Sequence, residues 1–216
     1  MANPPQSSSG SALRVFVLNR RVLLSIVLLV CVVWLITSNT FWRWMYPISY
    51  QNTIQSSASS AHVDPLLVAS VIHVESKYKT QDVSHAGAIG LMQLMPDTAQ
   101  WIAGKMSTTG TYLGYNASSQ NSDLAQPNLN IQLGCWYIRY LTDQFHGNQV
   151  AAIAAYNAGP KRVKEWLRDG TWNGELQTIN SIPVGETRHF VDRVFYNYNL
   201  YKRIYGLDAQ WQDRLK

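Results

Sequence analysis

An apolar run near the N-terminus constrains this chain more than any other feature. Residues 22–36 are almost wholly apolar, but a membrane-spanning helix needs about 20 residues. The uncharged residues 37–40 extend the run to the required length. Aromatic residues typical of a membrane interface follow, namely Phe41, Trp42, Trp44 and Tyr46. The pattern therefore predicts one transmembrane helix over residues 20–44.

Basic residues on one side of this run predict its orientation. Arg14, Arg20 and Arg21 precede the run, so the positive-inside rule places the N-terminus in the cytoplasm and the rest outside. A cleaved signal peptide is the alternative, but no small-x-small cleavage site follows Ile36. A buried core helix fits less well, because the run is apolar on every face. We expect a single-pass membrane protein in which residues 1–19 form a disordered cytoplasmic tail.

Composition limits the remainder to one sizeable domain. The chain has 216 residues, of which 46% are apolar and 14% charged. Its 12 Tyr and 8 Trp suit either a core or flat platforms for a glycan. A net charge of +5 suits an anionic partner. Nucleic acid is not favoured, because basic residues occur only in short pairs such as Lys161-Arg162.

The two cysteines suggest neither a disulfide nor a metal site. Cys31 lies in the apolar run and Cys135 in a predicted helix of the exported part, so we expect no bond between them. Two lone cysteines with scattered histidines do not make a zinc site either. We predict no metal and no cofactor.

Hydrophobic spacing predicts a mainly α-helical domain over residues 46–206, followed by a C-terminal tail over 207–216. One helix begins with Asp64 as N-cap and Pro65 in its first turn and ends near Ser76. Residues 107–126 are rich in Ser, Thr, Gly and Asn and suggest a long loop. A small sheet is expected within residues 83–94. Other helices are predicted at 48–61, 98–103, 127–145, 150–156, 161–169 and from about 186 onward.

Glu75 is the strongest candidate for chemistry. It ends a helix whose residues 66–74 are nearly all apolar, so burial and the negative end of the helix dipole both disfavour its charged form. A carboxylic acid that stays protonated near neutral pH can donate a proton to a glycosidic oxygen. The alternative is a surface glutamate paired with Lys77 or Lys79.

Five segments follow one another in a fixed order from Glu75 onward. They are VES at 74–76, SHAGAIGLMQLMP at 84–96, NLNIQLG at 128–134, AYNAGP at 155–160 and IPVGETR at 182–188. In order and spacing they resemble the catalytic domain of the soluble lytic transglycosylases, which has the goose-type lysozyme fold. The resemblance covers roughly residues 48–205. It implies a lysozyme-like α+β fold that is mainly helical, with a small β element.

The resemblance also implies site residues. Glu75 matches the essential acid of the family. Ser84 matches a residue that hydrogen-bonds near the scissile bond, and Tyr156 a residue beside the acid. The substrate-binding positions implied are Ser84, Gln93, Met95, Tyr156 and Glu186.

By resemblance, the chain cleaves the β-1,4 bond between N-acetylmuramic acid and N-acetylglucosamine and leaves a 1,6-anhydromuramic acid product. Glu75 acts first as acid and then as base, since no motif supplies a second carboxylate with a clear role. The implied partners are the glycan strands of peptidoglycan and, through the apolar run, the membrane. A hydrolytic muramidase and a non-catalytic glycan-binding envelope protein remain the alternatives.

Overall fold

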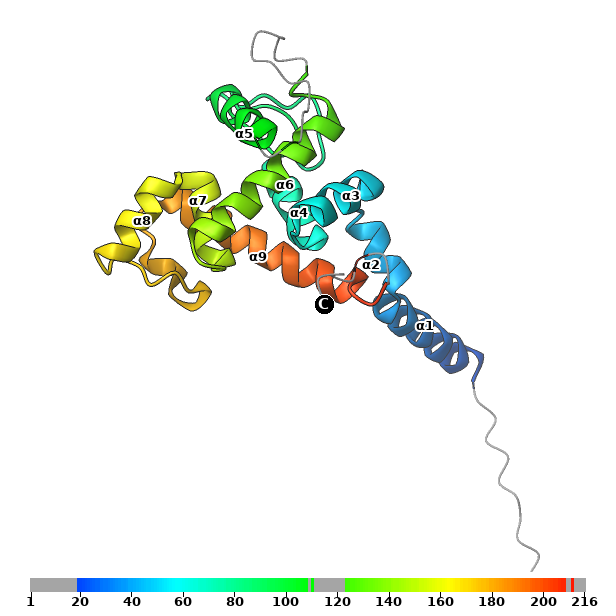
Figure 1. The fold of residues 1–216 in the computed structure, drawn as a ribbon. Helices are drawn as coiled ribbons and strands as arrows, with labels where there is room; N and C mark the ends of the chain where they lie inside the picture. Colours follow the sequence, from blue (N-terminus) through cyan, green and yellow to red (C-terminus); the bar gives the residue numbers. More distant parts are fainter. Residues whose placement is uncertain (1–18, 109, 111–122, 209–210, 212–216) are drawn as a thin grey trace, which may run out of the picture. The chain divides into compact units, whose positions relative to one another are not determined.

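The computed structural model describes residues 19–108, 110, 123–208 and 211 (Figure 1). The chain divides into two compact units, Met1–Trp44 and Met45–Lys216. The tail predicted over residues 1–19 and most of the predicted loop 107–126 lie outside the described residues, as does most of the C-terminal tail 207–216.

The N-terminal unit contains the apolar helix α1, Arg20–Thr37. Its 18 residues span about 27 Å at the usual helical rise, close to the thickness of a hydrocarbon core. Within the described part of the chain it is the one helix long and apolar enough to cross a membrane.

The aromatic residues after α1 form a separate helix rather than a continuation of it. Ser38 is extended and ends α1, and α2 then covers Asn39–Met45. Trp42 Nε1 donates to Ile36 O at 2.7 Å across this break. The bond satisfies a carbonyl that the end of α1 leaves without a helical partner. The segment predicted as one helix over 20–44 is therefore divided at Ser38.

The second unit is helical, as predicted. Its helices are α3 (Gln51–Ala61), α4 (Pro65–Glu75), α5 (Pro96–Thr108), α6 (Pro127–Gln144), α7 (Gln149–Ala158), α8 (Pro160–Arg168), the 3-10 helix η1 (Leu176–Ser181) and α9 (Gly185–Tyr205). The helix predicted at 98–103 is too short, because α5 begins at Pro96 and continues to Thr108.

Local capping explains where α4 begins. Asp64 Oδ1 accepts from Leu66 N at 2.8 Å, and Pro65 occupies the first turn. This confirms the N-terminus predicted from the sequence. The other Asp64 oxygen accepts from Tyr198 of α9 at 2.5 Å, so the cap also ties α4 to α9.

Helix α4 lies at the centre of this unit (Figure 1). Every residue from Pro65 to Ile72 is buried. The helix packs against α3 and α9, and α6 packs against α3, α5 and α7. A helix buried on nearly all faces has its termini fixed by its neighbours, so the position of Glu75 at its end is fixed as well.

The β element is smaller than predicted. Among the described residues, the segment expected to form a small sheet contains two isolated antiparallel bridges, Val83 with Ile89 and Ile89 with Leu94. Gly87 and Gly90 have φ of 88° and 81°. These left-handed turns fold the segment back on itself too tightly for regular strands to develop.

Two helical glycines give a matched test of this packing. A Cβ at Gly134 of α6 would overlap the sulfur of fully buried Met92, whereas a Cβ at Gly104 of α5 would meet no atom within 4 Å. We expect Gly134→Ala to lower the free energy of unfolding by about 1–3 kcal/mol through overpacking. Gly104→Ala should raise it by about 0.5–1 kcal/mol through helix propensity. Urea denaturation of both variants measures this, and equal effects would contradict the packing described.

Candidate active site

Glu75 is the last residue of α4, and the chain turns sharply after it. Lys77 and Tyr78 both take the left-handed conformation, with φ of 51° and 64°. Ser76 Oγ donates to Leu91 O at 2.8 Å and lies 3.2 Å from Ile72 O. Ser76 therefore joins the end of α4 to the loop of residues 82–95.

The surroundings of Glu75 favour its protonated form. The pKa of Glu75 is raised to about 8, because burial and the Glu186 carboxylate together outweigh the opposite effect of the Arg193 guanidinium. Burial is the largest of these effects. The side chain is therefore mostly protonated at neutral pH, which is the state that a general acid requires.

Helix α9 supplies both charges that act on Glu75. Glu186 lies in its first turn and Arg193 two turns later, so the two residues share one side of the helix. Arg193 Nη2 also donates to Val74 O at 3.2 Å. Glu186 is exposed, and it acts on the pKa of Glu75; its contact with substrate stays a prediction.

A buried asparagine holds the loop that faces Glu75. Asn130 of α6 is fully buried, and its amide donates to Ile89 O at 3.0 Å and Leu124 O at 2.9 Å. Its Oδ1 accepts from Met92 N at 2.7 Å. A Cβ on Gly90 would lie 2.6 Å from the Asn130 amide nitrogen. The close approach of loop and helix therefore requires glycine at this position.

Tyr156 lies near the end of α7 and contacts the same loop. Its hydroxyl donates to Met92 O at 2.7 Å. Burial raises the pKa of Tyr156 well above its ordinary value, and the neighbouring Glu75 and Tyr137 add to the shift. Tyr156 thus stays neutral, and its predicted role beside the acid stays a prediction.

Three predicted substrate-binding residues lie on the loop itself. Ser84 Oγ accepts from Ala88 N at 2.9 Å. Gln93 has φ of 46° and donates through Nε2 to two loop carbonyls, at 3.0 and 2.9 Å. Met95 is 42% exposed. Ser84 and Gln93 therefore shape the loop, and their contacts with a glycan stay predictions, as does that of Met95.

A group of stacked aromatic rings leads away from Tyr156. Tyr156 contacts Tyr137 at a ring distance of 5.5 Å, and Tyr137 stacks on Tyr140 at 6.4 Å with an interplanar angle of 11°. Trp101 of α5 meets Tyr140 edge-on at 5.0 Å. A cavity of about 310 Å³ opens here, lined by Asp97, Thr98, Trp101, Tyr137, Tyr140 and Pro160. A cavity of this size with aromatic walls fits a small polar ligand such as a sugar.

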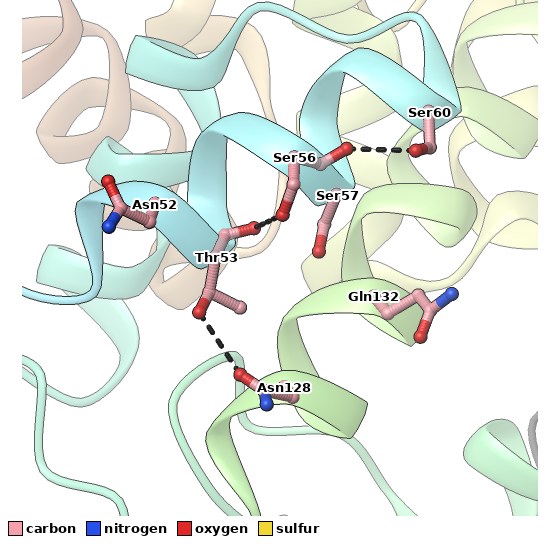
Figure 2. A pocket seen from close by; sticks show the side chains of 7 residues that line it. All are labelled: Asn52, Thr53, Ser56, Ser57, Ser60, Asn128 and Gln132. Atoms are coloured by element: carbon pink, nitrogen blue, oxygen red, sulfur yellow. Dashed lines mark hydrogen bonds between the residues drawn. The ribbon is translucent and has the colours of Figure 1, made fainter.

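A second hollow, of about 460 Å³, lies between α3 and α6 (Figure 2). Its lining is wholly uncharged and polar: Asn52, Thr53, Ser56, Ser57, Ser60, Asn128 and Gln132. Thr53 Oγ1 donates to Asn128 Oδ1 at 3.0 Å within it. Asn128 and Gln132 project from α6 on the side away from Asn130, because two residues turn a helix by about 200°. This hollow is therefore separate from the site around Glu75.

In the part of the chain that the structure describes, no group of three or more His, Cys, Asp or Glu residues could hold a metal ion. Both cysteines are free, and Cys135 is buried within α6.

Residues 52–178 match the family model described as the transglycosylase SLT domain. The chain belongs to this transglycosylase family. A soluble lytic murein transglycosylase of Salmonella typhimurium is 32% identical over 178 residues, which cover 78% of this chain and 26% of that protein. A membrane-bound lytic murein transglycosylase C of Sodalis glossinidius is 30% identical and matches 62% of this chain and 38% of its own length.

Solved structures of transglycosylases share the fold. The 70 kDa soluble lytic transglycosylase of Escherichia coli aligns with a TM-score of 0.68 and 29% identity, over 80% of this chain and 27% of that one. An inactive mutant of the lytic transglycosylase Slt from Pseudomonas aeruginosa aligns with a TM-score of 0.63 and 33% identity, over 73% and 24%. The mainly helical, lysozyme-like fold predicted from the sequence is confirmed. The chain spans about a quarter of the length of these soluble relatives.

Sequence reasoning missed two residues of this transglycosylase site. Asn130 lies in a segment that carried the resemblance, but no role was predicted for it. The available signal was an uncharged polar residue at a helix position between Leu129 and Ile131, where burial requires hydrogen-bond partners. Arg193 gave no signal, because only the packing of α9 against α4 brings its charge to Glu75.

The pKa of Glu75 leads to a prediction on stability. Between the ordinary value of 4.5 and about 8, the folded state holds a proton that the unfolded state has lost, so stability falls as pH rises through this window. Gln does not titrate. Glu75→Gln should match the wild type at pH 4 and exceed its unfolding free energy by about 1–3 kcal/mol at pH 8. Chemical denaturation across this range measures the difference, and a constant difference would refute the raised pKa.

Proposed function

We propose that this chain is a membrane-anchored lytic transglycosylase that cleaves the glycan strands of peptidoglycan. The observation that carries the proposal is Glu75 at the end of α4, whose raised pKa keeps it protonated, together with the neutral Tyr156. The named relatives are lytic murein transglycosylases, and one solved neighbour is a complex of the 70 kDa enzyme with bulgecin A. Both support a glycan of the cell wall as the substrate.

The proposed reaction begins with the proton on Glu75. Glu75 donates it to the oxygen of the β-1,4 bond between N-acetylmuramic acid and N-acetylglucosamine, and the bond breaks. The acetamido group of the substrate stabilises the cationic sugar. The ionised Glu75 then takes the proton of the C6 hydroxyl of the muramic acid, whose oxygen closes the 1,6-anhydro ring. The carboxyl ends protonated, ready for the next bond.

Hydrolysis by the same site is the second candidate. Glu186 is close enough to raise the pKa of Glu75, so it is the carboxylate that would activate a water in a two-carboxylate mechanism. Its exposure to solvent and its position at the start of α9 suit a lining role in the groove better. The products of the two reactions differ, since water leaves a reducing end and the internal attack leaves an anhydro ring.

The proposed location rests on α1. The helix has the length and apolarity of a membrane span, and Arg20 and Arg21 lie at its N-terminal end. By the positive-inside rule, the N-terminus is cytoplasmic and the site of Glu75 faces the wall. A membrane-bound relative supports anchoring in this family.

Digestion of purified peptidoglycan tests the proposed reaction. The wild-type chain should release muropeptides that end in 1,6-anhydromuramic acid, and mass spectrometry detects them as the loss of one water. Glu75→Gln should lower the rate by at least about 1,000-fold, because the proton donor is gone. Glu175→Gln, the same change at an exposed carboxylate, is the matched control and should release products at the wild-type rate. Reducing-end products instead would establish hydrolysis.

The two charges on α9 should move the pH dependence in opposite directions. Activity is expected to fall as pH rises through about 8, where Glu75 loses its proton. Arg193→Gln removes the charge that lowers the pKa of Glu75, so the alkaline limb of kcat/KM should move to higher pH. Glu186→Gln removes the charge that raises it, so the limb should move to lower pH. Shifts in the same direction would show that another group sets the limb.

A further inference from the structure

The aromatic cavity near the site continues into another hollow, of about 430 Å³, beside α8. The two share Tyr140 and Pro160 as lining residues. Beyond these, the hollow beside α8 is lined by three cationic side chains of that helix, Lys161, Lys164 and Arg168, and by the carboxylate of Glu165. A single depression therefore runs from aromatic walls at one end to a cationic helix face at the other.

The aromatic end suits the apolar face of a sugar ring. Trp101 is 39% exposed and presents its ring at the edge of the cavity. Tyr140 lies between Trp101 and Trp136, and it stacks on Trp136 at 5.5 Å with an interplanar angle of 9°. Such mutual support keeps the rings in place, so they lose little conformational entropy when a flat ligand packs on them. The ring series ends at Tyr156, beside Glu75, so a strand bound here leads toward the acid.

The cationic end has positive charge available for a ligand. Lys161, Lys164 and Arg168 lie three and four residues apart, on one side of α8. Lys164 Nζ donates to Gln144 Oε1 at 2.7 Å, and Arg168 pairs with Asp169 at 2.9 Å. Lys161 is exposed. The lining of the two hollows together has these three cations and two carboxylates, Glu165 and Asp97, so one excess positive charge remains.

We infer that this depression is a distal subsite for peptide-bearing glycan, in which a sugar packs on Trp101 and Tyr140 while carboxylates of its stem peptide bind Lys161 and Lys164. The inference rests on the proposed function and names the substrate feature that the groove recognises. The stem peptides of peptidoglycan are attached to muramic acid and carry free carboxylates. Ammonium groups at the rim of an aromatic cavity match that combination of sugar ring and anion.

The test compares binding to two ligands. Full-length Glu75→Gln protein in detergent micelles is sedimented with insoluble peptidoglycan strands, either intact or stripped of their peptides by an amidase. The intact strands should bind about fivefold more tightly, as expected for two exposed ion pairs. Added Lys161→Gln and Lys164→Gln substitutions should bring this ratio close to one, and the ratio should also fall with rising salt.

A matched pair of substitutions controls for net charge. Arg162 and Arg203 are exposed and do not line the depression, so Arg162→Gln with Arg203→Gln removes the same two charges elsewhere. This control should keep the preference for intact strands. Loss of the preference in the control, its survival in the lysine variant, or no preference in the parent protein would each overturn the inference.

Two further measurements separate the possible failures. Trp101→Ala should weaken binding to both kinds of strand by about fivefold or more, since a stacking contact does not depend on the peptide. A loss confined to intact strands would contradict the placement of the sugar. Product analysis of the wild-type protein tests the proposed reaction separately. A binding preference without any cleavage would refute the reaction while leaving the subsite intact.

Discussion

The hydrogen bonds of one buried side chain hold this site together. Asn130 satisfies three backbone groups of the surrounding segments, at Ile89, Met92 and Leu124. An unsatisfied buried polar group costs about 1–3 kcal/mol, so each of these bonds excludes the conformations that lack it. Two further hydrogen bonds hold the loop, because Leu91 O accepts from Ser76, the C-cap of α4, and Met92 O accepts from Tyr156 of α7. Side chains from α6, α7 and the C-terminal end of α4 therefore bond to the carbonyls of Leu91 and Met92 and to the amide of Met92.

This arrangement decides the chemistry of Glu75. Burial has the largest effect on its pKa, whereas the two charges that act on it in opposite directions come from α9. Arg193 alone would favour the ionised form, yet burial outweighs it. An acid that must donate a proton and then recover one needs a pKa near the working pH. The nearby arginine moderates the effect of burial and so keeps the proton transferable.

The sequence predicted most helices of the second unit and the burial of Glu75, because both depend on local patterns. Asp64 and Pro65 predicted the start of α4, and the apolar run before Glu75 predicted its burial. The expected sheet was reduced to two bridges because its glycines take left-handed turns, which no strand pattern reveals. The division of the N-terminal segment at Ser38 was missed, because residues 37–40 were counted as part of the run for their lack of charge although all four are polar. The partner of the Tyr156 hydroxyl depends on contacts between segments distant in the chain.

The grouping of basic side chains on one face of α8 is a second feature that the sequence did not predict. Along the sequence, Lys161 and Arg162 form one short basic pair, which favours no particular ligand. The helix separates them by about 100° and gathers Lys161 with Lys164 and Arg168 around one hollow. The hollow between α3 and α6 has nearly the same volume but no charged lining residue (Figure 2). Size alone therefore does not distinguish the two. Of these two hollows, the one beside α8 joins cationic side chains to aromatic rings that lead to Glu75. In the proposed function, an anionic group bound there would therefore belong to the strand that Glu75 is proposed to cut.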